Sequence, residues 1–130
     1  MNTLETLKQA RALVEKGWTK GVMVRNVGPR INCYCSVGAI SKAVGLLDGK
    51  APSLTDAWNA RHSATVVMAQ ALFDGTDRSW EQCYADMDDP TYRREGWAQD
   101  QLIYWNDHPA RTKEEVLAGF DIAIEAAHGG

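Results

Sequence analysis

Apolar residues recur at every third or fourth position through most of this chain, which is the spacing of one buried helical face. The last segment has the most regular pattern, with Val116, Phe120 and Ala123 on one side. The first segment places Leu7 and Val14 on one side in the same way. The pattern predicts helices over residues 3–16, 35–47, 54–73, 80–87, 91–105 and 113–127.

Capping residues mark the starts of several of these helices. In a capping box, a short polar side chain accepts a backbone hydrogen bond while Glu or Gln three residues later bonds back. The matching pairs are Asn2 with Glu5, Ser79 with Gln82, and Thr112 with Glu115. At the other end of the first helix, we expect Gly17 to adopt the left-handed conformation that ends many helices.

Between the first two helices the apolar pattern changes to alternation. Val22 and Val24 alternate with polar or larger residues, residues 26–29 have turn chemistry, and Ile31 and Cys33 share one face of a returning strand. Because a two-stranded hairpin is marginal alone, we expect it to lie against helices. The expected fold class is mainly α (α+β), with about five or six helices packed around a small N-terminal β-hairpin.

Composition fits an ordinary globular protein with a single domain over residues 1–130. The chain is 45% apolar and 24% charged, and its net charge is −3. That charge suits neither an acidic mimic of nucleic acid nor a typical nucleic-acid binder. No apolar run reaches membrane-spanning length, and the N-terminus lacks the apolar block of a signal peptide. We therefore expect a cytoplasmic protein without a membrane partner.

Cysteine usage does not indicate a metal site. Cys33 and Cys35 are separated by one residue, whereas structural zinc ligands are spaced more widely and come with a second ligand pair. With Cys83 the count is odd, and in a reducing cytosol we expect all three to stay thiols. The chain has no phosphate-binding glycine motif, so we expect neither a metal nor a cofactor.

Cys35 lies at the predicted start of a helix, where a thiol can be activated. A nucleophile there would need a base, such as His108 or His62. The alternative is a small buried side chain at a strand–helix junction, and we favour it. For Gly38, three residues later, we favour close packing over phosphate binding.

The stretch WNDHPART (105–112) is the second unusual place. Asn106 and Asp107 can bond nearby backbone groups and end the preceding helix, while Arg111 can pair with Asp107 or bind an anion. A structural corner between two helices is the favoured interpretation, and such a corner can also present a surface to a partner. Four basic residues near the hairpin form either a weak anion-binding patch or a solvated face: Lys16, Lys20, Arg25 and Arg30.

These two stretches carry a resemblance. CYCSVGAI (33–40) and WNDHPARTKEEVLAGFDIAI (105–124) resemble a domain-of-unknown-function family of small phage and bacterial proteins. The similar positions are Trp18, Gly21, Cys35, Gly38, Ala39, Trp105, Asn106, Asp107, Arg111, Thr112 and Val116, and the chain departs from the pattern at Ala110, where we expect glycine. The resemblance implies a phage or prophage origin and a shared fold, but no activity and no cofactor.

Three functions remain open at this point. The favoured one is a phage-type accessory protein that binds a host protein, for example to inhibit a host defence enzyme, since five Trp and four Tyr can anchor an interface. The others are a binder of a nucleotide-like small ligand and a thiol enzyme that uses Cys35. The candidate binding residues are Cys35, Trp105, Asn106, Asp107, His108 and Arg111, and we assign no catalytic residue.

Overall fold

Five helices and two strands form the described part of the chain, which is residues 2–29, 31–73 and 90–129 of a computed structural model. In chain order they are α1 (Thr3–Lys16), β1 (Val24–Gly28), β2 (Ile31–Tyr34), α2 (Ser36–Ala43), α3 (Leu54–Phe73), α5 (Pro90–Asp107) and α6 (Lys113–Gly129). The helix expected over residues 80–87 lies outside the described residues. The expected fold class, mainly α with a small N-terminal hairpin, is confirmed.

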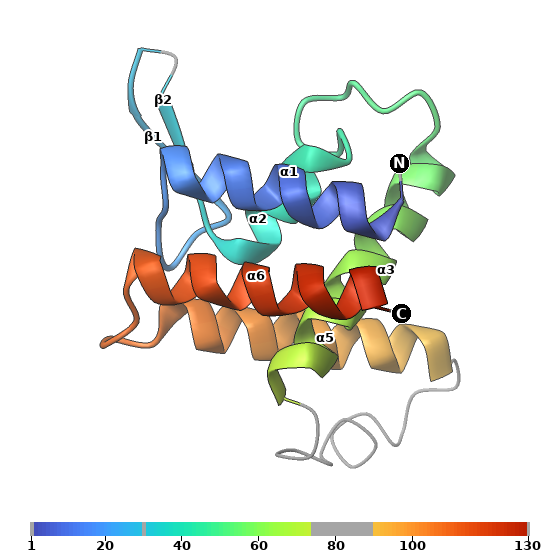
Figure 1. The fold of residues 1–130 in the computed structure, drawn as a ribbon. Coiled ribbons are helices and arrows are strands. Elements are labelled where there is room, and N and C mark those ends of the chain that lie inside the picture. The colour runs from blue at the N-terminus through green and yellow to red at the C-terminus, as the bar shows by residue number, and fades with distance from the viewer. Residues whose placement is uncertain (1, 30, 74–89, 130) are drawn as a thin grey trace.

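The first and last helices are neighbours in space. In Figure 1, α1 and α6 run side by side in opposite directions, and α3 packs against both α5 and α6. The short helix α2 lies against α1 and contacts α5. This arrangement brings the start of α2 close to the end of α5, although the two are far apart in sequence.

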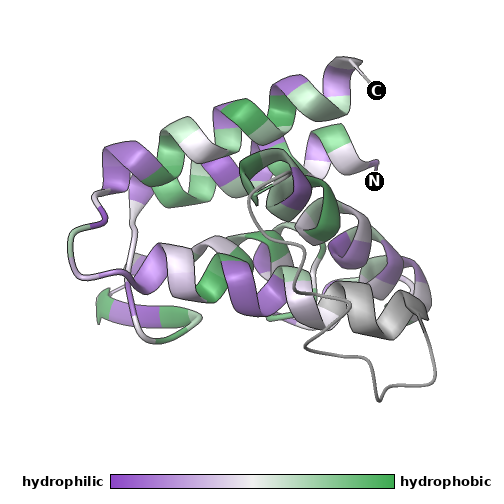
Figure 2. Cartoon of the chain, turned by 90° about the horizontal axis from the view of Figure 1, so that it is seen from below, coloured by the Kyte–Doolittle hydropathy of each residue, from purple (hydrophilic) through white to green (hydrophobic). Residues whose placement is uncertain are grey.

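Each helix contributes an apolar face to one core, and the apolar and polar bands along the helices are visible in Figure 2. The largest fully buried apolar side chains are Leu7, Val14, Val37, Ile40, Met68, Leu102, Val116 and Phe120. Most of them lie on the faces that the periodicity predicts. The same periodicity places Trp58 of α3 on the inner face, but Trp58 is 50% exposed. Its ring lies beside the guanidinium of Arg61.

Local capping interactions explain where two of the helices begin. The Asn2 side chain accepts a hydrogen bond from the Glu5 N–H at 2.8 Å, which starts α1. At α6, Thr112 Oγ1 accepts from the Glu115 N–H at 3.2 Å, and Glu115 Oε1 accepts from the Thr112 N–H at 2.9 Å. The capping box expected at Thr112 is therefore present in full.

Gly17 differs from its expected conformation. Its φ of −172° is extended, so the expectation of a left-handed residue is wrong. A Cβ at this position would lie 2.8 Å from the Asn32 O and 3.0 Å from the Cys33 Sγ. Glycine is thus needed for close contact between the end of α1 and β2, not for its conformational freedom.

The hairpin is antiparallel, as expected, with Val24 opposite Tyr34 and Asn26 opposite Asn32. The two strands differ in their contacts with the helices. β2 contacts α1 and α2, whereas four of the five residues of β1 are exposed. Figure 1 shows β1 and β2 projecting away from the helices. The expectation that the hairpin lies against helices therefore holds for β2 alone.

None of the helices in the described parts of the chain combines the length and the apolar character needed to span a bilayer.

Candidate functional site

The side chain of Asn106 connects three distant segments of the chain. Asn106 is completely buried in the last turn of α5, one residue beyond the predicted end of that helix. Its Oδ1 accepts hydrogen bonds from Trp18 Nε1 at 2.8 Å, from the Ser36 N–H at 3.1 Å and from Ser36 Oγ at 2.8 Å. Its Nδ2 donates to the Thr19 O and to Asp107 Oδ1, both at 3.0 Å. Every polar atom of the amide is thereby engaged within the protein.

Asp107 and Lys20 extend this connection to the surface. Asp107 Oδ1 also accepts from the Gly21 N–H at 3.0 Å. Lys20 Nζ donates to the His108 O at 2.8 Å and to the Pro109 O at 3.2 Å. Together these bonds fasten residues 18–21, which lead into the hairpin, to the corner that follows α5.

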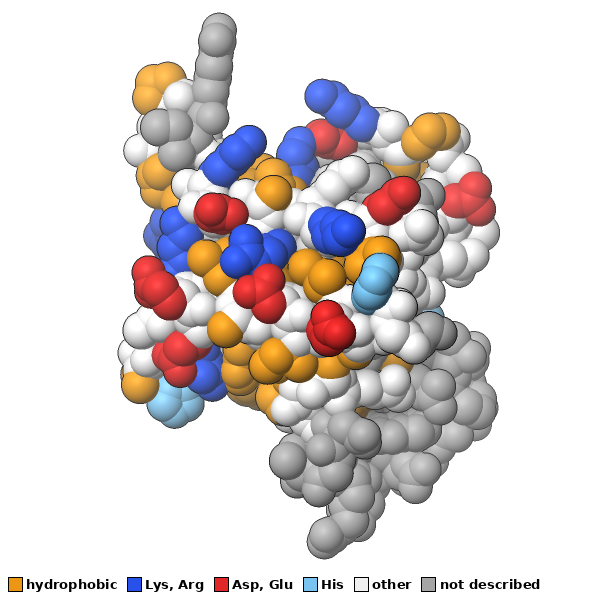
Figure 3. Space-filling view, viewed as in Figure 1, with side chains coloured by type: hydrophobic (Ala, Val, Ile, Leu, Met, Phe, Trp, Pro, Cys, Tyr) orange, Lys and Arg blue, Asp and Glu red, His pale blue; other side chains and the backbone are white. Residues whose placement is uncertain are grey.

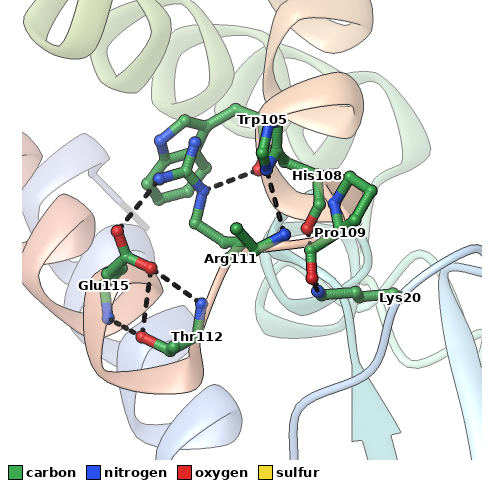
Figure 4. A network of polar contacts seen from close by, with 8 residues as sticks. Lys20, Trp105, His108, Pro109, Arg111, Thr112 and Glu115 are labelled. Atoms are coloured by element: carbon green, nitrogen blue, oxygen red, sulfur yellow. Dashed lines mark hydrogen bonds and ion pairs between the residues drawn. The ribbon is translucent and has the colours of Figure 1, made fainter.

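Arg111 lies on the side of the corner away from Lys20, next to Trp105 and Glu115 (Figure 4). Its Nε donates to the Trp105 O at 2.8 Å, its guanidinium lies 4.8 Å from the Trp105 ring centre, and Nη1 is 3.3 Å from Glu115 Oε2. Its backbone N–H donates to the His108 O. Hydrogen bonds from Thr112 hold the pKa of Glu115 below its ordinary value, which keeps the partner of Arg111 ionised. Arg111 therefore pairs with Glu115, whereas Asp107 is engaged with Gly21 and Asn106.

Cys35 caps α2. Its Sγ accepts a hydrogen bond from the Gly38 N–H at 3.3 Å, and the side chain is buried. Burial raises the pKa of the Cys35 thiol, although the hydrogen bond from Gly38 acts in the opposite direction. The Ser36 N–H is held by Asn106, so protein groups satisfy the start of this helix. This setting matches the favoured interpretation of a packed junction residue and gives no activated thiolate.

Gly38 allows that junction to form. A Cβ here would lie 2.0 Å from the Met23 O, which accepts a hydrogen bond from the Cys35 N–H at 3.1 Å. The favoured packing interpretation of Gly38 is confirmed, since backbone and not a ligand occupies the space that its missing side chain leaves.

Cys35 is expected to react slowly with alkylating agents. In a Cys83→Ser background near pH 7, half-buried Cys33 should be alkylated about tenfold faster or more than Cys35, because a buried thiol with a raised pKa exposes little thiolate. Mass spectrometry of the native protein after timed iodoacetamide treatment measures both rates. Equal rates would contradict the buried setting and restore the case for a nucleophile.

The six candidate residues thus fall into two groups. The structure brings Cys35, Asn106 and Asp107 to the α2–α5 junction, while Trp105, His108 and Arg111 form the corner before α6. In both groups the polar atoms bond mainly to other parts of the chain. A ligand-binding role for these residues stays a prediction, and their observed contacts stabilise the fold.

The outer edge of β1 has a different character. On β2, the Tyr34 N–H donates to the Gly17 O at 2.9 Å and the Tyr34 O accepts from the Thr19 N–H at 3.2 Å, so both groups point away from β1. In an antiparallel pair, two directly opposed residues either both direct their N–H and C=O groups toward the partner strand or both direct them away from it. Val24 lies opposite Tyr34, so its N–H and C=O point outward, as do those of Asn26 two residues later. Within the described residues, no third strand pairs with this edge.

Hollows in the described surface lie elsewhere. One of about 440 Å³ lies between the α2–α3 connection and α3, and Lys42, Asp48, Lys50 and Asp56 contribute to its wall. The charges there are balanced, and Lys42 pairs with Asp48. In the parts of the chain that the structure covers, no cluster of three or more His, Cys, Asp or Glu could hold a metal ion.

A family model described as a family of unknown function, DUF6197, matches residues 1–126. The chain belongs to this family. No curated protein and no solved structure matches it. The match to DUF6197 spans the hairpin, the α2–α5 junction and the corner before α6, so all three are parts of the family's common region.

Sequence reasoning missed two participants in the junction of this DUF6197 protein. Thr19 supplies a backbone acceptor and Ser36 supplies both an N–H and a hydroxyl to Asn106. Ser36 follows the cap residue of α2, where an unpaired N–H requires a partner, and that position is the signal that could have pointed to it. Nothing local marks Thr19, because only its main chain takes part.

Proposed function

We propose that this protein acts by binding another protein, and that the outer edge of β1 is the contact. The observation that carries the proposal is the unpaired backbone of Val24 and Asn26 on a projecting hairpin. An unpaired strand edge is a template for a strand from another chain, and proteins usually protect such edges. Peptide recognition by strand addition uses this property.

The side chains along this edge support the proposal. Val22, Val24 and Val27 are 44%, 41% and 55% exposed. Figure 3 shows hydrophobic side chains on the hairpin, at the upper left. Three exposed valines in or just before the strand with the open edge leave apolar area in water, and a partner that covered them would bury that area.

In this proposal the partner is a protein of a bacterial host, and the chain is a phage-type accessory protein that inhibits a defence enzyme. The resemblance of residues 33–40 and 105–124 to phage and bacterial proteins supports that context. The contacts of Cys35 and Asn106 add indirect support for a protein-binding role over an enzymatic one. Both residues are buried and form hydrogen bonds with other residues of the chain.

The substitution Val27→Asp is expected to reduce partner recovery from host lysate about tenfold or more, because it places a charge beside the apolar edge. Ile122→Asp is the matched control, since Ile122 is 51% exposed and lies on α6. Quantitative mass spectrometry of material captured by each tagged variant makes the measurement. Equal recovery with both variants, or a partner lost only with Ile122→Asp, would contradict a contact at β1.

A further inference from the structure

A second hollow lies where α1 crosses the end of α2 (Figure 1). This α1–α2 hollow has a volume of about 260 Å³ and is lined by Gln9, Ala12, Leu13 and Lys16 of α1 with Lys42 and Ala43 of α2. Both of its charged residues are lysines, because Asp48 and Asp56 line the larger neighbouring hollow instead. The lining therefore combines positive charge with an apolar wall.

The Lys42 side chain is held in place from the α2 wall. Its Nζ pairs with Asp48 Oδ2, while Asp48 Oδ1 accepts from the Lys50 N–H at 3.1 Å. The Lys42 side chain is 30% exposed, so most of its length is covered. Asp48 Oδ2 takes only one N–H of the ammonium, and the others remain for a ligand. A donor fixed in advance loses less conformational entropy when a ligand binds.

Lys16 and Gln9 provide further donors from the α1 wall. Gln9 lies two helical turns before Lys16, so the two side chains project from the same side of α1. Within the described part of the chain, neither side chain has a hydrogen bond or an ion pair with another residue. Among the six lining side chains, Gln9 Oε1 is the single acceptor. The hollow therefore offers many more donors than acceptors.

This lining indicates the chemistry of an occupant. Donors that carry positive charge favour carboxylate or phosphate oxygens, which form charge-assisted hydrogen bonds with them. The apolar side chains of Ala12, Leu13 and Ala43 favour an apolar body on the same molecule. In other proteins a cavity of about 150 Å³ holds a benzene ring, so this hollow has room for one ring and a charged group.

We propose that the α1–α2 hollow binds a small organic anion, which is a carboxylate or a phosphate monoester attached to an apolar body about the size of one ring. Lys16 and Lys42 bind the charged group from two different helices, and Leu13 contacts the body. A bare inorganic anion is disfavoured because it would leave the apolar wall in water. The site is separate from the edge of β1, and the inference does not depend on the proposed function.

NMR titration of the intact, isotope-labelled protein tests this inference. The probes are phenyl phosphate and benzoate, with benzamide as the neutral analogue and inorganic phosphate as the anion without a ring. We expect phenyl phosphate or benzoate to bind with a dissociation constant of about 1 mM, and to shift the amide signals of Leu13 and Ala43. The tighter of the two identifies the charged group. Benzamide and inorganic phosphate should each bind about tenfold more weakly.

Substitutions in the lining show whether binding occurs in this hollow. Lys16→Gln and Lys42→Gln should each weaken binding about tenfold, whereas Lys8→Gln should not, since Lys8 is exposed on α1 outside the lining. Ala12→Leu fills the hollow without changing its charge and should abolish binding. Because leucine is a good helix former, this variant keeps the test decisive if Lys42→Gln disturbs the α2–α3 connection.

Several outcomes would overturn the inference. If inorganic phosphate binds as tightly as phenyl phosphate and Ala12→Leu changes neither, the hollow takes an adventitious ion only. Equal binding of benzamide and benzoate would exclude a role for the lysines. A loss with Lys8→Gln as large as with Lys16→Gln would show that only the overall charge of α1 matters. The contact at β1 is tested separately by Val27→Asp and stands or falls independently.

Discussion

Replacing Asn106 with alanine is expected to lower the free energy of unfolding by about 3 to 4 kcal/mol, because it removes a fully satisfied buried amide. The Ser36 hydroxyl and N–H, the Trp18 Nε1 and the Thr19 O would each lose a partner. Chemical denaturation measures the change, and Asn59→Ala on the exposed surface of α3 is the control. A loss below about 1 kcal/mol would show that the amide does not hold the junction together.

A second substitution at the same position separates hydrogen bonding from packing. Asn106→Asp keeps the shape, but an ionised carboxylate cannot donate to the Thr19 O and would repel Asp107. The three donors to Oδ1 would favour the carboxylate, but complete burial, the Thr19 O and Asp107 all oppose it. We therefore expect its folded-state pKa to rise above the ordinary Asp value of about 3.9. Stability should be best below that ordinary value, where the group is protonated, and should fall as the pH rises through the folded-state pKa. Denaturation across pH tests this, and a variant equally unstable at all pH values would contradict it.

Replacing Gly38 with alanine is expected to cost about 3 kcal/mol, the upper part of the range for overpacked sites. The added Cβ would lie 2.0 Å from the Met23 O and 2.7 Å from the Met23 C, so backbone must move. That movement breaks the bond between the Met23 O and the Cys35 N–H, which joins the hairpin to α2. Intrinsic helix propensity predicts the opposite sign, because alanine is favoured over glycine by about 1 kcal/mol within helices.

Gly129→Ala provides the matched control for that substitution. Gly129 ends α6, and nothing lies within 4 Å of a Cβ built there. We expect its unfolding free energy to be unchanged or slightly raised. Denaturation of both variants, with hydrogen exchange of the Cys35 amide in Gly38→Ala, makes the comparison. A stable Gly38→Ala with a protected Cys35 amide would contradict the close approach of the hairpin.

The parts of the fold that were predictable depend on short-range interactions. The cap at Asn2 bonds Glu5, and Thr112 bonds Glu115, so each signal and its partner lie within four residues. The periodicity of α6 likewise predicted that Val116, Phe120 and Ala123 are buried. Trp58 was wrongly expected on the buried face of α3. The periodicity of one helix does not show which side of its apolar face contacts a neighbouring helix.

The candidate site was predicted only in outline. The two unusual stretches meet through Ser36 and Asn106 and not through Arg111. The sequence offered Asp107 or an anion as the partner of Arg111, whereas Arg111 pairs with Glu115, four residues later. Asn106 was expected in a loop, whereas it is in the last turn of α5, which turns its amide inward.

The sequence by itself determined most of the described helical segments, the presence of a hairpin and the small residue required at Gly38, because these follow from local periodicity, capping and backbone sterics. The turn expected over residues 26–29 was misplaced, since Asn26 and Gly28 pair with β2 on either side of a bulge. The tertiary structure decided that Asn106 bonds Ser36 and Trp18, which are 70 and 88 residues away in sequence. It also decided that Tyr34 of β2 is covered by residues 17–19 while the edge of β1 is left open. No local pattern distinguishes these edges, since each would serve equally well until α1 and its following segment pack against one of them.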